Sequence, residues 1–167
     1  MEMLTDGLRA LGERRIPNFR LRSDPKKLAA AALEVFSATE FDKATLSGVT
    51  RRLGLNRSVI YRYYASKREL LDKVIEEFCL DGELTNQNTM DALERLLQSD
   101  AAAKVLRIVL REWSNIPEIG AHYINALSAK IAIKMKISDI EEARRLAIAA
   151  VVPEVTAIVF SREGKAS

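Results

Sequence analysis

The segment FDKATLSGVTRRLGLNRSVIYRYYASK, residues 41–67, decides the fold, because it contains two short helical patterns separated by a turn at Gly54. From residue 42 onward it carries six Lys and Arg but a single Asp, and basic and aromatic residues crowd its second helical pattern. Two short helices joined by a tight turn with Gly are typical of a helix-turn-helix, which places its second helix in the major groove of DNA. We therefore expect this segment to bind DNA.

Capping residues predict where the helices of this segment begin. Thr45 is a candidate N-cap for the first helix, which turns its apolar residues inward, and Asn56 is a candidate N-cap for the second. If the second helix starts after Asn56, the α-helical period turns Ile60 and Tyr64 toward the core together with Leu55. The same period leaves an outward-facing set of four residues, with Tyr63 at its edge: Arg57, Ser58, Tyr61 and Arg62.

The outward-facing side chains have the chemistry that DNA recognition needs. An arginine can donate two hydrogen bonds to guanine, and a tyrosine hydroxyl can bond a phosphate oxygen. Ser66 is a candidate cap for a fourth helix, and Lys67 then lies in its first turn. A positive side chain beside a helix N-terminus is well placed for a phosphate, although its charge is unfavourable for the helix dipole.

The residues before this segment predict one further helix and a basic arm. Ser23, Asp24 and Pro25 form a strong helix start, and apolar residues recur at helical spacing as far as about Thr39. Upstream, residues 3–14 have the spacing of a short amphipathic helix, and residues 14–22, RRIPNFRLR, lack a helical period. The latter is either an arm that reaches the minor groove through Arg20 and Arg22 or a leader without a role.

The span from residue 27 to residue 78 resembles the N-terminal domain of the TetR family of transcriptional repressors. The positions that carry the resemblance are Ala31, Ala32, Phe36, Thr45, Gly54, Asn56, Tyr61, Tyr64 and the run Ser66-Lys67-Arg68-Glu69-Leu70. The resemblance implies that four residues bind phosphates, namely Thr45, Tyr61, Tyr63 and Lys67. It implies that three approach base edges, namely Arg57, Ser58 and Arg62.

The chain departs from the family pattern at three positions near this motif. Glu40 stands where the family usually has Gly, so the turn after the first helix of the motif must form without an easy left-handed residue. Gly48 lies inside a predicted helix, at a cost of about 1 kcal/mol relative to Ala. Thr50 replaces a common Ala. None of these changes removes a candidate DNA-binding side chain.

The rest of the chain is predicted to be helical as well, so the expected fold class is all-α. We expect an N-terminal extension over residues 1–23, a three-helix head with a linking fourth helix over 24–82, and a helical body over 83–167. Helical periods in the body cover residues 89–98, 100–114, 117–136 and 138–162. The resemblance implies that the last two helices form a homodimer. The candidates for a ligand pocket are Met90, Leu93, Leu97, Trp113, His122 and Tyr123, although core packing accounts for each of them more simply.

Composition and charge exclude several other classes of protein. Residues 14–73 hold 14 Lys and Arg against six Asp and Glu, so a polyanion-binding surface is expected there, or else a solvated basic face. No apolar run reaches the roughly 18 residues of a membrane span, and no secretory signal is recognisable. The single Cys, Cys79, suits a cytoplasmic protein. No metal-ligand cluster, phosphate-binding loop or catalytic pattern is present, so neither cofactor, metal nor enzymatic activity is expected.

Together these patterns favour a homodimeric transcriptional regulator that binds a pseudo-palindromic site on double-stranded DNA. We expect a cytoplasmic repressor, nucleoid-associated when bound to DNA, that a small apolar or amphipathic molecule releases. The alternative is an architectural, plasmid-partition or nucleoid protein on the same fold, without a ligand.

Overall fold

The computed structural model of the protein describes residues 24–82 and 89–163, and within these ranges every regular element is a helix. The predicted all-α fold is therefore confirmed. The predicted helix over residues 3–14 and the basic arm with Arg20 and Arg22 lie outside the described residues. None of the described helices is long and apolar enough to cross a membrane.

The head consists of α2 (Pro25–Ala38), α3 (Leu46–Arg52), the short helix η1 (Arg57–Arg62) and α4 (Lys67–Phe78). Each starts at the cap that the sequence predicts: side chains of Asp24, Thr45, Asn56 and Ser66 accept hydrogen bonds from amides of the following turn. Gly54 has a φ of 64°, the left-handed conformation that the turn between α3 and η1 requires.

The second helix of the helix-turn-helix differs from the prediction in its winding. The α-helical period was expected after Asn56, but η1 is a 3₁₀ helix of six residues. The segment is short and rich in β-branched and aromatic residues, which lose rotamer freedom in an α-helix. The predicted core contacts are nevertheless present, because Ile60 and Tyr64 are buried, together with Val59.

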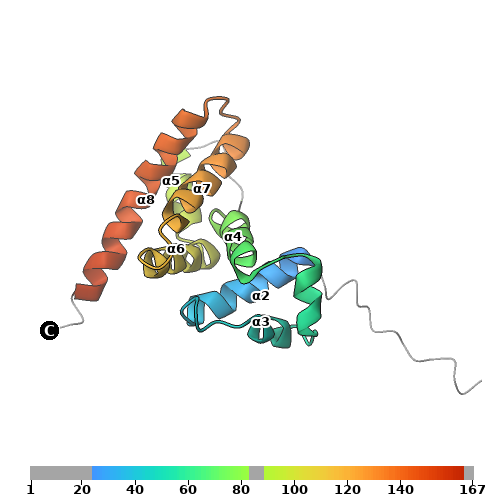
Figure 1. Ribbon diagram of the computed structural model, residues 1–167. Helices are drawn as coiled ribbons and strands as arrows, with labels where there is room; N and C mark the ends of the chain where they lie inside the picture. Colours follow the sequence, from blue (N-terminus) through green and yellow to red (C-terminus); the bar gives the residue numbers. More distant parts are fainter. Residues whose placement is uncertain (1–23, 83–88, 164–167) are drawn as a thin grey trace, which may run out of the picture.

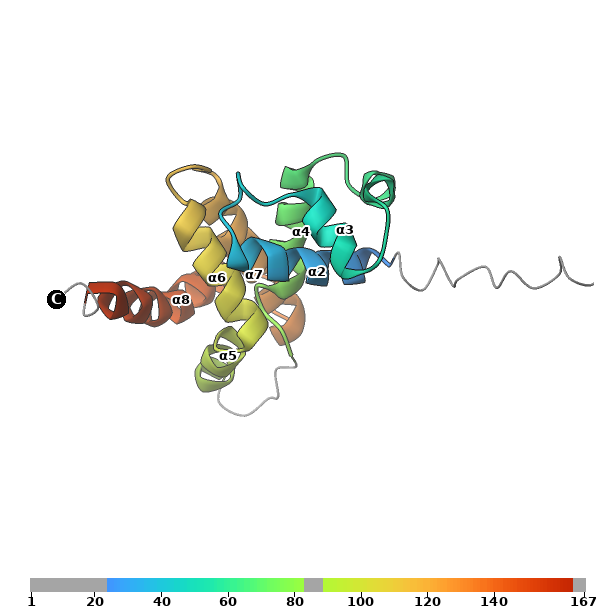
Figure 2. The same cartoon turned by 90° about the horizontal axis from the view of Figure 1, so that it is seen from below.

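The body consists of α5 (Thr89–Leu97), α6 (Asp100–Glu112), α7 (Ile119–Met135) and α8 (Ile140–Glu163). Helices α7 and α8 pack along each other on the side of the molecule away from α3 (Figure 1). Seen from below, α2 lies between α3 of the head and α6 of the body (Figure 2), and it packs on both helices as well as on α4. Thus α2 joins the head to the body through α6, and α4 joins it through both α6 and α7.

One hydrophobic core runs through the head and the body without a break. Phe36 of α2 and Leu71 of α4 are fully buried in the head, as are Leu93 of α5 and Ile119 of α7 in the body, and all four belong to the same cluster. Ion pairs between Lys104 and Glu34, 2.7 Å, and between Arg68 and Glu118, 2.9 Å, bridge the two parts near the surface. The head is therefore packed directly against the body through a shared core and surface ion pairs.

Candidate nucleic-acid interface

A groove of about 450 Å³ lies where the start of α3, the helix η1 and the start of α4 meet. It collects predicted DNA-binding residues from three separate elements, because Thr45, Arg57, Tyr61 and Lys67 all line it. The remaining lining residues are Ala44, Leu46, Ser47, Ala65 and Ser66. The helix-turn-helix fold thus brings four of the seven predicted residues to one surface.

The start of α4 gives this groove a favourable environment for an anion. Ser66 accepts a hydrogen bond from the amide of Glu69 at 3.0 Å, and the Glu69 carboxylate accepts one from the amide of Ala65 at 2.5 Å. These reciprocal bonds resemble a capping box and fix the first turn. The positive end of the helix dipole then faces the groove, where a phosphate group would be stabilised.

Arg57 and Tyr61 are in direct contact on the exposed side of η1. The Arg57 guanidinium donates a hydrogen bond to the Tyr61 hydroxyl at 3.0 Å and lies 5.8 Å from the centre of the Tyr61 ring. Tyr61 is 50% exposed. The contact holds a guanidinium and a phenol oxygen side by side at the surface, the combination that can bond a base edge and a neighbouring phosphate.

In the free protein, Lys67 binds backbone carbonyl groups of a neighbouring loop, which the sequence did not indicate. Its ammonium group donates to the carbonyl oxygens of Phe41 at 2.6 Å, Ala44 at 3.1 Å and Asp42 at 3.3 Å, and it lies 4.4 Å from the centre of the Phe41 ring. These bonds engage all three donors of an ammonium group. Lys67 therefore holds the loop before α3 in place, and a phosphate contact would require it to exchange a carbonyl for the phosphate.

The other predicted residues lie on η1 and at its end. Ser58 and Arg62 are exposed, and Tyr63 is 39% exposed. The Ser58 hydroxyl donates to the Asn56 side chain at 3.4 Å, so it also takes part in the cap of η1. Their positions leave the predicted roles open: contact with base edges for Ser58 and Arg62, and with phosphate for Tyr63.

Arg111 of α6 supplies the cap that the C-terminus of α2 lacks. A left-handed Gly often ends a helix and satisfies its last carbonyls, but here Glu40 replaces it and Thr39 is extended, with a φ of −140°. The Arg111 guanidinium donates instead to the carbonyl oxygens of Thr39 at 2.9 Å, Ser37 at 3.1 Å and Phe36. A side chain of the body thereby satisfies the last carbonyl groups of a helix in the head.

Glu112, the next residue, holds the following turn. Its side chain is 1% exposed and accepts hydrogen bonds from the Arg111 guanidinium at 2.8 Å, from the Phe41 amide at 3.0 Å and from the Asn115 side chain at 3.4 Å. Burial disfavours the charged carboxylate, but these bonds and the Arg111 charge outweigh it, so the pKa of Glu112 is lowered. We call Arg111 and Glu112, with the backbone of residues 36–41, the head–body clamp.

Sequence reasoning missed the clamp because its partners lie 71 to 75 residues apart in the chain. Arg111 donates to backbone carbonyl oxygens. Every residue has such a carbonyl, so no sequence motif identifies the ones that Arg111 binds. The only signal was indirect: without a Gly after α2, some other group had to satisfy the end of that helix. The clamp and Lys67 together fix the loop that leads into Thr45 and hence the near edge of the groove.

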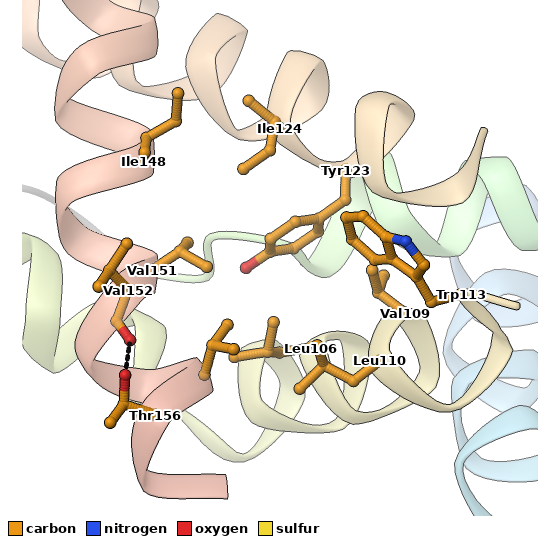
Figure 3. A pocket seen from close by; sticks show the side chains of 11 residues that line it. Leu106, Val109, Leu110, Trp113, Tyr123, Ile124, Ile148, Val151, Val152 and Thr156 are labelled. Atoms are coloured by element: carbon orange, nitrogen blue, oxygen red, sulfur yellow. Dashed lines mark hydrogen bonds between the residues drawn. The ribbon is translucent and has the colours of Figure 1, made fainter. Parts of the chain in front are cut away.

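The body contains a second concave site, an apolar cavity of about 490 Å³ between α6, α7 and α8 (Figure 3). Of the six residues predicted for a ligand pocket, Trp113 and Tyr123 line this cavity. The others lie elsewhere: Leu93 and Leu97 in the core, Met90 packed against it, and His122 facing α4, its ring nitrogen 3.4 Å from the carbonyl oxygen of Asp72. Residues from α6 and α8, among them Leu106 and Val151, form the rest of the wall.

Comparison with known proteins agrees with the geometry of the head. Residues 28–74, from α2 into α4, match the model of a family described as bacterial regulatory proteins, tetR family. The uncharacterised HTH-type transcriptional regulator YxbF of Bacillus subtilis (strain 168) is 30% identical over 99 residues, which are 59% of this chain and 25% of that protein. The chain thus spans about a quarter of the length of this curated relative.

Among solved structures, the chain also aligns with one from Mesorhizobium loti MAFF303099, of a protein assigned to the TetR family of transcriptional regulators. The two share 12% sequence identity with a TM-score of 0.45, over 84% of this chain and 98% of the other.

Proposed function

Because the chain belongs to the TetR family of bacterial regulatory proteins through its N-terminal domain, we propose that it is a homodimeric regulator that binds a pseudo-palindromic DNA site and represses transcription until a small molecule releases it. The observation that carries the proposal is the groove at the start of α4, where Arg57, Tyr61 and Thr45 lie beside a capped helix N-terminus. Base readout by Arg57 and phosphate binding by Tyr61 and Thr45 follow from the chemistry of these side chains.

Exposed apolar side chains on the last two helices support the proposed dimer. Ile133 of α7 is 78% exposed, and Ile140, Ile148 and Val152 of α8 are about half exposed. Apolar side chains exposed in this way on two packed helices are what a dimer interface requires. Dimerisation would place two copies of η1 so that they can contact successive major grooves, about 34–36 Å apart along the duplex. Sedimentation equilibrium of the protein and of Ile133→Glu tests this part, since the variant should shift toward monomer.

DNA binding is tested by selecting sites from random duplexes and then measuring affinity by fluorescence anisotropy. Tyr61→Phe should weaken binding to selected and random DNA alike and leave the salt slope nearly unchanged, because the hydroxyl that is removed carries no charge. Arg57→Ala should remove about 1–3 kcal/mol of discrimination at one base pair. It should reduce the affinity for random DNA less than the affinity for selected DNA.

Arg107→Ala is the matched control, because it removes one positive charge from an exposed position of α6, outside both the groove and the last two helices. A protein that selects no common sequence would overturn the proposed regulator. Equal losses on selected and random DNA for Arg57→Ala would refute the base contact alone. Lys67→Ala is the less informative variant, since the loss of three loop hydrogen bonds would accompany any loss of a phosphate contact.

A further inference from the structure

The ammonium group of Lys67 is enclosed by backbone carbonyls where α3 and α4 approach each other. We call the carbonyl oxygens of Phe41, Asp42 and Ala44, which accept its hydrogen bonds at 2.6, 3.3 and 3.1 Å, the carbonyl cage. The Phe41 ring closes one side, with its centre 4.4 Å from the ammonium nitrogen. An ammonium group has three N–H donors, so Lys67 would have to release one carbonyl to bind a phosphate. The cage therefore competes with the phosphate contact that the sequence predicts.

The carbonyl cage connects two walls of the groove. Lys67 belongs to the first turn of α4, whereas the three carbonyls belong to the loop that ends at Thr45, the N-cap of α3. The Thr45 hydroxyl accepts a hydrogen bond from the Gly48 amide at 3.1 Å, and both Thr45 and Lys67 line the groove. The bonds from α4 to this loop thereby fix where Thr45 lies relative to α4.

The two ends of the loop are held by different partners. At its start, the Glu112 carboxylate of the clamp accepts a hydrogen bond from the Phe41 amide at 3.0 Å. Toward Thr45, the loop is held by the buried methyl group of Ala44 and by the bonds from Lys67. Without the ammonium group, the end of the loop beside Thr45 should therefore become the looser one.

We propose that Lys67 supports DNA binding as a positioning residue, which holds Thr45 in its place at the groove and does not itself bind the phosphate. The inference rests on the proposed function, in which the groove binds DNA, and it concerns the role of one residue there. A phosphate ligand needs a positive charge that reaches the phosphate. The carbonyl cage instead needs a compact group with three donors on one nitrogen, which only lysine provides.

Arginine separates the two roles, because it keeps the charge and does not fit the cage. Its donors are spread over three nitrogen atoms of a rigid plane, and this fork suits a phosphate well. In a cage built around a single nitrogen, the larger guanidinium has to move the loop or leave it. Lys67→Arg should therefore preserve a phosphate contact but not the position of the loop.

The test compares the wild type, Lys67→Arg and Lys67→Met by fluorescence anisotropy on selected duplexes at several salt concentrations. We expect both variants to bind about 3- to 10-fold more weakly. A hydrogen bond to a charged group contributes a factor of about 10 or more, but Glu112 still holds the other end of the loop. The salt slope should stay within about 0.3 of the wild-type value in both variants, because no ionic contact with phosphate is lost.

Hydrogen exchange in the free protein reports on the loop itself. The amides of Lys43 and Ala44 donate to the carbonyl oxygen of Glu40 at 3.1 and 2.9 Å. Both amides should exchange about 3- to 10-fold faster in the two Lys67 variants, because the loop opens more often. Arg107→Met is the matched control, which removes an exposed charge outside the groove and should change neither exchange nor DNA affinity.

Circular dichroism and thermal unfolding establish that each variant is folded at the temperature of the measurements. If Lys67→Met does not fold, Lys67→Arg gives the same comparison, because it retains the charge and the aliphatic stem. Lys67→Arg with the DNA affinity of the wild type would overturn the inference, as would a salt slope that falls by about 0.9 in Lys67→Met.

Two further outcomes separate this inference from a purely structural role and from the proposed function. Faster exchange of the loop amides with unchanged DNA affinity would show that Lys67 only stabilises the fold, and would overturn the inference. A wild-type protein that binds no selected duplex would overturn the proposed function, and the inference with it. Wild-type binding that survives in Lys67→Arg overturns the inference alone.

Discussion

Replacing Arg111 should cost far more stability than replacing any ordinary surface arginine. Arg111→Met keeps the length of the side chain but removes the bonds to three carbonyl oxygens at the end of α2 and the partner of the buried Glu112 carboxylate. Breaking a buried ion pair on one side costs about 3–5 kcal/mol. Arg111 itself is 26% exposed, so water can replace part of its bonding, and we expect a loss of about 2–4 kcal/mol.

The measurement is equilibrium unfolding in urea, followed by circular dichroism. At this chain length the expected loss corresponds to a fall of about 5–15 °C in melting temperature. Arg107→Met is the matched control: Arg107 lies one turn earlier on α6, is exposed, and should cost less than about 0.5 kcal/mol. The reasoning is refuted if the two variants unfold at the same urea concentration.

The charge of Glu112 provides a second check on the same clamp. In the Arg111→Met background, Glu112→Gln should recover stability, because the uncompensated buried charge disappears while the side chain can still accept from the Phe41 amide. In the wild type, the lowered pKa of Glu112 means that its carboxylate contributes stability above the unfolded pKa of about 4.3 and loses it as the pH falls through the folded pKa. The advantage of wild type over Glu112→Gln should therefore shrink below about pH 4.5. An advantage that is constant with pH would contradict the assigned pairing.

Three further outcomes follow from burial and backbone geometry. Burial raises the pKa of the fully buried Cys79 thiol to about 11. Iodoacetamide at pH 8 should therefore alkylate Cys79 only in unfolded molecules, and rapid alkylation of the folded protein would refute its burial. Lys136 ends α7 with a φ of 54°, so Lys136→Gly should stabilise the protein by up to about 1 kcal/mol, which urea unfolding would detect. Gly120→Ala should push the Trp113 ring outward and shift its emission to longer wavelength, and an unchanged spectrum would show that the ring does not rest on Gly120.

The sequence by itself determined the helices of the head, their caps and the side chains that face outward. Caps and turns are local interactions between residues two to four apart, so Thr45, Asn56 and Ser66 could be assigned from spacing. The apolar period likewise predicted the four helices of the body to within a few residues. The sequence did not predict that η1 is a 3₁₀ helix, because the α-helical and 3₁₀ patterns differ little over six residues.

Only the tertiary structure decided how these parts are joined and where the body is hollow. The sequence marked Lys67 as a phosphate ligand, while the fold also uses its ammonium group to bind the loop before α3. The clamp formed by Arg111 and Glu112 ends on backbone groups more than 70 residues away, which no pattern of side chains reveals. Tyr123 looked the same in sequence whether it was core or pocket. Only the fold shows that its hydroxyl, which has no hydrogen-bond partner among the described residues, lies at a space between α6, α7 and α8.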